Sequence, residues 1–575
     1  MKRRLAILLA LVGTLLGLGF ALAGGASAHA TVVTSDPVDG SRLAHPPSVV
    51  TITFDESVGL GGASYLHVTD QSGNRVDNGP AFHPNGDATK VADRVQPGLG
   101  DGTYTASFRV VSADSHPVAG TIRFVVGNGV LAAPGATHTS TVNPTTSVAF
   151  DIARWTSFTG VALLGGAWLL LTVWPQGRDD RRGRAIVWTG WGLTGLGALS
   201  ELLLQGPYTA GTGLSDVANW TLLDATLHTS FGHYLSARLV LLGAVALVLG
   251  RALQRERWRS RVEDAAWPLA VAVALTFSSV GHPDTTNPRW LSVTADTLHV
   301  LAMAAWVGGM VVLAAAVLPR REPAEVRAVL PVFSRVAFAS VAVLAVTGSY
   351  AAWHGIGTVQ AIFTTTYGLL VVGKVALFLG LLALGNVSRL AIQRQLATVP
   401  VAYAMSDHTV LDEQAAGQAD DPGEDALSAT DAERLRRSVL VEIVLAACVL
   451  VLTAVLVAQP RGKEAIATRE LRPAAASTDL GDGSSARVTI TPGRHGTVVV
   501  DISLSSVAKG TKIRATAALP GQQLGPIPIP LAADGANQFT ASNVNLPAAG
   551  DWVISLVVTT SQFDAVTAQV KIHLY

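Results

Sequence analysis

The sequence predicts a multi-domain membrane protein with an exported all-β sandwich, a bundle of eight transmembrane helices and a C-terminal all-β sandwich. First, the 575 residues are 49% hydrophobic and 14% charged, with a mean hydropathy of +0.39, which is too apolar for a soluble protein and too long for one domain. Second, apolar runs long enough to cross a bilayer recur through the middle of the chain. Third, both ends alternate apolar and polar residues, as strands do.

Residues 1–28 have the pattern of a signal peptide. Lys2-Arg3-Arg4 precede a long apolar stretch, and small residues end at Ala28. Cleavage there would make His29 the N-terminus, where amine and imidazole together can chelate a divalent metal. Taken alone, a histidine at this position is better explained by chance.

Residues 29–127 predict a β-sandwich. The stretches 50–54, 104–110 and 121–126 alternate, and turn residues separate them. Asp114 and His116 stand two residues apart between the last two strands, so on extended chain they point to one side. With His29 they form a nitrogen and oxygen set suited to tetragonal Cu(II).

Three segments here resemble the CopC family of copper-binding proteins: HATVVTSDPVDGSRL from His29, FDESV from Phe54 and SADSHPVAGTIRF from Ser112. The resemblance implies a cupredoxin-like or immunoglobulin-like sandwich that binds Cu(II) through His29, Asp114 and His116. Some relatives carry methionine-rich Cu(I) sites, but residues 29–145 contain no methionine. His45, His67 and His83 match no motif and are expected on the surface.

A linker is expected at 128–147 and the membrane domain at 148–460. Four loops are rich in arginine (175–184, 251–264, 319–328 and 388–437), whereas the alternating loops 207–228, 282–290 and 353–366 hold only Arg289. The positive-inside rule therefore places the first set in the cytoplasm and both chain ends outside. The acidic loop 388–437 is expected to be flexible. The eight predicted spans are 148–174, 185–206, 229–250, 265–281, 291–318, 329–352, 367–387 and 438–458.

The fifth span carries ionisable residues and methionines on one face. At about 100° per residue, Asp296, His299, Met303, Trp306 and Met310 fall within an arc of about 80°. Carboxylate, imidazole and thioether are ligands for a transition metal, copper above all. Ionisable groups inside a bilayer usually mark function. The structural alternative is a buried Asp–His hydrogen bond with methionines filling gaps.

Other polar residues are expected near the outer membrane face. His228, His233 and His282 fall there together with His299 and His354, which suggests an entry site for metal. Glu201 near the outer end of the second span and Lys374 inside the seventh are read either as a structural pair or as part of a path.

Four stretches resemble the CopD family of copper-resistance membrane proteins: SSVGHPDTT from Ser278, ADTLHVLAMAAWVGGM from Ala295, VTGSYAAW from Val346 and TTYGLLVVGK from Thr365. The resemblance covers about 148–460 and implies copper handling at or across the membrane. Residues 461–575 predict a second external sandwich with a faint resemblance to YtkA-like domains. With His495 and His573 as its only histidines and no cysteine or methionine, it is not expected to bind metal.

These observations predict a copper protein of the cytoplasmic membrane. Cu(II) captured by the N-terminal sandwich would pass to the membrane residues, with Cu(I) favoured at the methionines. One alternative is a haem-binding redox protein with His233 and His299 as axial ligands; another is a copper chaperone or sensor that serves an accepting protein or oxidase. Zero net charge gives no reason to expect nucleic acid, and without a Walker A sequence no ATPase or other enzyme is expected.

Overall fold

The computed structural model describes most of the chain, in two compact units. One unit holds the helices between Asn143 and Gln459, and the other holds the strands before and after them. The described residues are 30, 32–60, 64–112, 117–128, 143–253, 259–280, 288–320, 322–397, 429–457, 459, 461–463, 465–466, 473–481, 483–505, 511–533, 537–559 and 565–575.

The N-terminal strands form a sandwich, as predicted. One sheet has the order β1-β3-β6; the other has the order β2-β8-β7-β4, with β5 also paired to β7. Val50, Ile52 and Phe54 alternate with exposed or half-buried residues along β3 and enter a shared core, because successive side chains of a strand face opposite sides. The strands are β1 (Val32–Asp36), β2 (Ser41–Leu43), β3 (Val49–Phe54), β4 (Val58–Gly59), β5 (Tyr65–Thr69), β6 (Lys90–Arg94), β7 (Gly102–Ser112) and β8 (Pro117–Val126).

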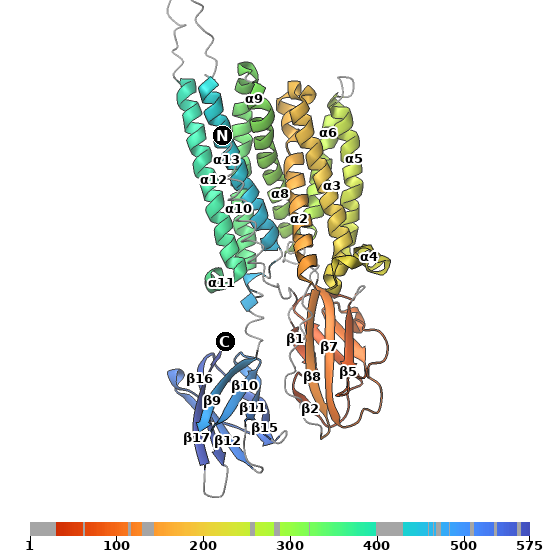
Figure 1. Cartoon of the computed structure of the whole chain (residues 1–575), viewed down its shortest axis with the longest axis vertical. Coiled ribbons are helices and arrows are strands. Elements are labelled where there is room, and N and C mark those ends of the chain that lie inside the picture. The colour runs from red at the N-terminus through yellow and green to blue at the C-terminus, as the bar shows by residue number, and fades with distance from the viewer. Residues whose placement is uncertain are drawn as a thin grey trace, which may run out of the picture. The chain divides into compact units, whose positions relative to one another are not determined.

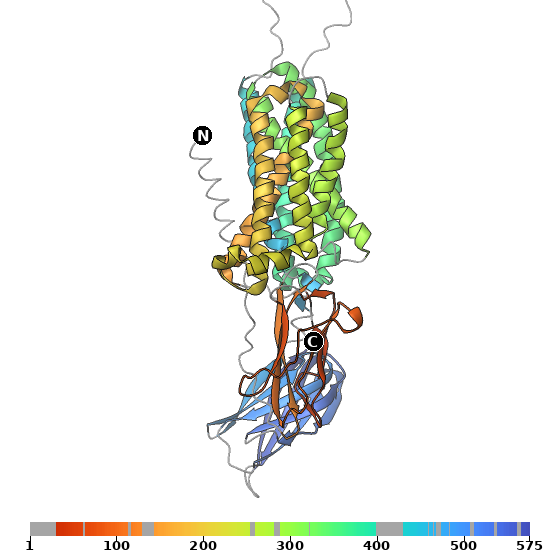
Figure 2. The same ribbon diagram turned by 90° about the vertical axis from the view of Figure 1, so that its right-hand side faces the viewer.

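The middle of the chain is a bundle of long, roughly parallel helices (Figures 1 and 2). Short helices α4 and α11 lie at one end of this bundle and α9 lies at the other (Figure 1). The helices are α2 (Pro144–Leu164), α3 (Arg181–Ala210), α4 (Trp220–Leu227), α5 (Ser230–Ala252), α6 (Arg259–Ser278), α8 (Arg289–Val312), α9 (Leu318–Arg320), α10 (Pro323–Ile356), α11 (Val359–Thr364), α12 (Thr366–Ala397) and α13 (Ala429–Val457).

Among the described residues, six helical segments have the length and apolar composition of a membrane span. They begin at Pro144, Ser230, Arg289, Ala324, Thr366 and Arg436. The two other predicted spans are helical as well, as α3 and α6. Six spans are thus supported by composition where eight were expected.

Some helix boundaries differ from the predicted ones for local reasons. Helix α2 begins four residues before position 148, because the Asn143 side chain accepts hydrogen bonds from the Thr145 and Thr146 N–H groups and Pro144 fits the first helical turn. Helices α12 and α13 extend into the expected loop 388–437, up to Ala397 and from Ala429. The middle of that loop and residues 1–28 lie outside the described residues.

The C-terminal strands form two sheets around one core, in agreement with the predicted all-β region. The sheet orders are β14-β15-β11-β10-β9 and β13-β12-β16-β17. Trp552 of β16 is fully buried in this core, with Val488 and Val500 from the facing sheet. The strands are β9 (Ala474–Gly481), β10 (Ser484–Thr491), β11 (Gly496–Leu504), β12 (Lys512–Leu519), β13 (Leu524–Ile529), β14 (Ala532–Ala533), β15 (Gln538–Leu546), β16 (Gly550–Thr559) and β17 (Ala565–Leu574).

Candidate functional site

The residues predicted to bind Cu(II), His29, Asp114 and His116, lie outside the described residues, but the chain on either side of them is described. Val32 pairs with Phe54, and Ser112 pairs with Val58, four residues further along. The segments that lead to His29 and to Asp114 are therefore both anchored at the connection from β3 to β4.

The ring of His299 on α8 is held by a threonine of α10. Its Nδ1 lies 2.8 Å from the Thr347 Oγ1, and the same hydroxyl donates to the Val343 carbonyl oxygen at 2.7 Å. A hydroxyl has a single hydrogen, so Thr347 can only accept from the imidazole. The Nδ1 of a neutral His299 therefore carries the proton, and its Nε2 keeps a lone pair that can bind a metal.

Asp296, one turn before His299, contacts two other helices. Its carboxylate is hydrogen-bonded to Ser278 of α6 and attracted by Lys374 of α12. The Lys374 charge also acts on His299. Four helices, α6, α8, α10 and α12, thus bring a carboxylate, an imidazole and an ammonium group together inside the bundle. Asp296 and His299 each interact with residues of other helices. A hydrogen bond between the two side chains, the structural alternative, therefore does not explain their positions.

The rest of the predicted stripe on α8 has an apolar environment. Met310 is buried in the helical core, and Met303 packs against the same core. Between them, Trp306 makes an edge-on contact with Phe378 of α12, with ring centroids 6.1 Å apart. The stripe therefore changes along its length from ionisable groups to thioethers among apolar side chains.

The other predicted histidines that the structure describes do not join this group. His228 is 79% exposed, and its Nδ1 hydrogen-bonds to the Asp224 carbonyl oxygen at 2.8 Å. His233 is also exposed, in the first turn of α5. The His354 Nδ1 lies 3.0 Å from the Tyr350 carbonyl oxygen, and His282 lies outside the described residues.

A second polar group inside the bundle, which no pattern in the sequence predicted, is centred on Arg238 of α5. Its guanidinium lies 3.9 Å from Glu201, donates to the Thr276 hydroxyl and carbonyl at 3.0 and 2.9 Å and stacks on Phe277 at 3.5 Å. Glu201 therefore pairs with Arg238, whereas Lys374 attracts the carboxylate of Asp296. An arginine inside the apolar run 229–250 was the signal that could have revealed this group.

Three family models match successive parts of the chain. The CopC domain matches residues 32–127, the copper resistance protein D-like N-terminal domain matches 145–287, and copper resistance protein D matches 327–456. The first match covers the N-terminal sandwich, and the other two cover most of the helices.

Curated relatives match parts of the chain of different length. The copper transport protein CutJ of Bacillus subtilis is 28% identical over 382 residues, which are 64% of this chain and 69% of that protein. Copper resistance protein C of Xanthomonas campestris is 33% identical over 106 residues, 18% of this chain and 82% of that protein. Among solved structures, CopC of Methylosinus trichosporium is 28% identical and covers 17% of this chain and 93% of its own length, with a TM-score of 0.16.

Proposed function

Because this chain belongs to the CopC and CopD family of copper resistance proteins and carries both modules, we propose that it binds Cu(II) outside the cytoplasmic membrane and transfers copper across it. The N-terminal sandwich captures the ion through His29, Asp114 and His116. The membrane helices then receive it at His299 and Asp296. Flux is inward and serves copper uptake, homeostasis and resistance. Copper here is the cargo, and the chain supplies the ligands.

The observation that carries the proposal is the hydrogen bond from His299 to Thr347. It orients the imidazole and leaves Nε2 able to bind copper, one turn from the Asp296 carboxylate. A ligand with a fixed tautomer loses less freedom when the ion arrives, so a second helix that orients the ring favours ligation. Met303 and Met310, further along the same face, offer thioether sulfurs, which are softer ligands than the nitrogen and oxygen donors of the proposed capture site.

The positive charge of Lys374 offsets the negative charge of Asp296 at this site. Its ammonium group attracts the Asp296 carboxylate when copper is absent. An arriving cation would compete with Lys374 for the carboxylate, and the lysine would then repel the ion from Asp296. Such competition keeps binding weak enough for the ion to move on, which transfer through a membrane requires.

The proposed topology has eight spans, with both sandwiches on the extracytoplasmic side. The arginine-rich loops support this arrangement. The position of α4 and α11 at one end of the bundle and of α9 at the other supports it too (Figure 1), because α4 and α11 belong to the arginine-poor loops. The proposed domains are a signal peptide at 1–28, the sandwich at 29–127, a linker at 128–147, the membrane domain at 148–460 and the external sandwich at 461–575.

Cellular copper content tests this function. Cells that express the chain from a plasmid should accumulate more copper from a copper-limited medium than cells with the empty plasmid. Equal copper content at normal expression would instead favour a chaperone or sensor that hands copper to an accepting protein or oxidase. A reduced-minus-oxidised absorption spectrum of the purified protein tests the haem alternative, which requires haem bands.

A further inference from the structure

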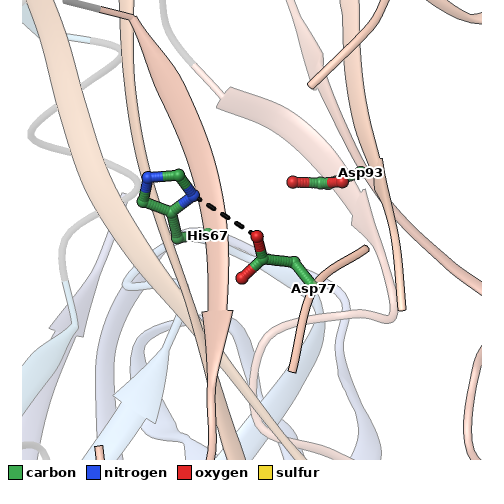
Figure 3. Close-up of side chains that lie close together, drawn as sticks. All are labelled: His67, Asp77 and Asp93. Carbon is green, nitrogen blue, oxygen red and sulfur yellow. Dashed lines mark ion pairs between the residues drawn. The ribbon is translucent and has the colours of Figure 1, made fainter. Parts of the chain in front are cut away.

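His67, Asp77 and Asp93 of the N-terminal sandwich form a cluster that the copper path does not use (Figure 3). One ligand atom from each lies within 4.8 Å of the other two. His67 is on β5 and Asp93 on β6, in different sheets, and Asp77 lies on the chain between them. In Figure 3 the carboxyl end of Asp93 is turned toward Asp77 and His67.

Strand pairing explains why His67 meets Asp77. Thr69 forms an antiparallel bridge with Arg75, and the Val76 N–H donates to the Val68 carbonyl in the same register. Two residues before Thr69 and two residues after Arg75, that register sets His67 directly opposite Asp77. Directly opposed residues point to the same face, and the His67 Nδ1 lies 3.6 Å from the Asp77 Oδ2.

Pairing also brings Asp93 to this face. Asp77 bridges antiparallel to Val95, and Asp93, two residues before Val95, points to the same side as that residue. Asp93 is 0% exposed. The Arg94 N–H attracts its carboxylate, but neither carboxylate oxygen makes a hydrogen bond of normal geometry with the described residues. A buried carboxylate without such partners is costly unless a cation compensates it.

The two carboxylates of this cluster differ in how closely a cation compensates them. Asp77 is compensated, because it accepts from the Arg75 guanidinium and from the Val68 N–H at 3.1 Å. Asp93 is attracted by the charges of Arg75 and Arg94, but among the residues that the structure describes neither its Oδ1 nor its Oδ2 accepts a side-chain hydrogen bond. Burial and, secondly, the charge of Asp77 raise the pKa of Asp93 to about 6. The His67 Nδ1 is also buried and makes no hydrogen bond there.

We propose that His67, Asp77 and Asp93 form a second site in the sandwich for a divalent transition-metal ion, Cu(II) in preference to Zn(II). Imidazole and carboxylates are ligands of both ions, and nitrogen and oxygen sites bind Cu(II) more tightly. Ligand atoms at about 2.0–2.2 Å from one ion lie up to about 4.4 Å apart, so small side-chain rotations suffice. Residues 29–145 contain no cysteine or methionine, which disfavours Cu(I).

This site does not depend on the proposed membrane path and shares no residue with it. It also shares none with His29, Asp114 and His116. The N-terminal sandwich would therefore hold two ions. The competing explanation is that Asp77 and Asp93 share a proton and bind no metal. Measuring the metal content of the protein distinguishes the two explanations.

The test uses the full-length protein in detergent, stripped with a chelator, loaded with Cu(II) or, separately, with Zn(II), and desalted. Copper per chain is measured by mass spectrometry for the wild type and two variants, Asp93→Asn and His67→Gln. The first keeps the shape of the side chain, and the second changes a side chain that is 35% exposed, so at least one variant should fold. Asp87→Asn is the matched control, because Asp87 is an acid near β6 that pairs with Lys90 at 3.1 Å.

Both variants should lose one copper ion per chain relative to the wild type, while Asp87→Asn should lose none. In a His116→Ala background, which weakens the other predicted site of the sandwich, Asp93→Asn should still remove one further copper ion per chain. Wild-type copper content in Asp93→Asn and His67→Gln would overturn the proposal. A loss in Asp93→Asn without a loss in His67→Gln would overturn the three-residue ligand set.

Discussion

The imidazole of His299 and the hydroxyl of Thr347 form a hydrogen bond of 2.8 Å between α8 and α10. Because that hydroxyl already donates to the Val343 carbonyl oxygen, the histidine must be the donor. The bond therefore determines which nitrogen of His299 faces the rest of the bundle unprotonated. In the proposed function this nitrogen is the copper ligand.

Thr347→Val should reduce copper transfer. Valine has the shape of threonine but cannot accept the Nδ1–H, so the ring loses its orientation and its tautomer preference. Removing such a partner typically costs about 10–100-fold in metal affinity or activity. Copper accumulation in cells measures the effect. Thr453→Val is the control, because the Thr453 hydroxyl makes the same bond to a carbonyl one turn earlier, that of Val449 on α13. Equal accumulation in both variants would argue against the role of Thr347.

Variants of Asp296 and Lys374 should affect the stability of the protein and its copper transport differently. Asp296→Asn leaves the buried Lys374 ammonium without the attraction of that carboxylate, which should lower the thermal stability, because an uncompensated buried charge is destabilising. The double variant Asp296→Asn with Lys374→Gln removes both charges and should regain most of the thermal stability measured in detergent. Transport should stay impaired in the double variant, since the carboxylate is still missing. Recovery of both properties would make the pair purely structural.

One residue added before His29 should weaken Cu(II) binding strongly. The extension moves the terminal amine away from the imidazole and breaks the predicted chelate. Titration of the purified extended and mature proteins with Cu(II) measures the difference. The second proposed site would remain occupied in the extended protein. If the extended protein retained the tightest binding event of the mature form, the ligand set of His29, Asp114 and His116 would be wrong.

Thiol labelling in intact cells tests the topology. In a Cys448→Ala background, cysteines placed at Ser260 and Ser428 should be protected from an impermeant reagent. A cysteine at Ser542, which is exposed on β15, should react. The reverse pattern would contradict the eight-span arrangement with both sandwiches outside.

The sequence predicted the elements of the fold well, because their signals are local. Alternation along 50–54 marks a strand with one buried face, and β3 shows that alternation. Apolar runs likewise mark helices. Helix ends were less predictable: α2 starts early because Asn143 caps it, and a capping side chain does not change hydropathy.

The candidate sites were predictable only in part, because partners on other elements do not appear in a periodic pattern. Periodicity placed Asp296 and His299 on one face, but Thr347 and Lys374 come from helices far along the chain. His67 was expected on the surface; it is half-buried in a cluster that depends on the register of the segment 75–77 between two sheets. Arg238 is a single charge in the apolar run 229–250, and its partners Glu201 and Thr276 come from other helices.

Copper uptake by proteoliposomes that contain the purified protein tests the central claim most directly. With Cu(II) supplied outside, wild-type vesicles should accumulate copper faster than empty ones. His299→Ala should reduce uptake to the level of empty vesicles, while the purified variant still binds Cu(II) through its N-terminal sandwich. Wild-type uptake by His299→Ala would contradict the claim that copper crosses the membrane by way of His299.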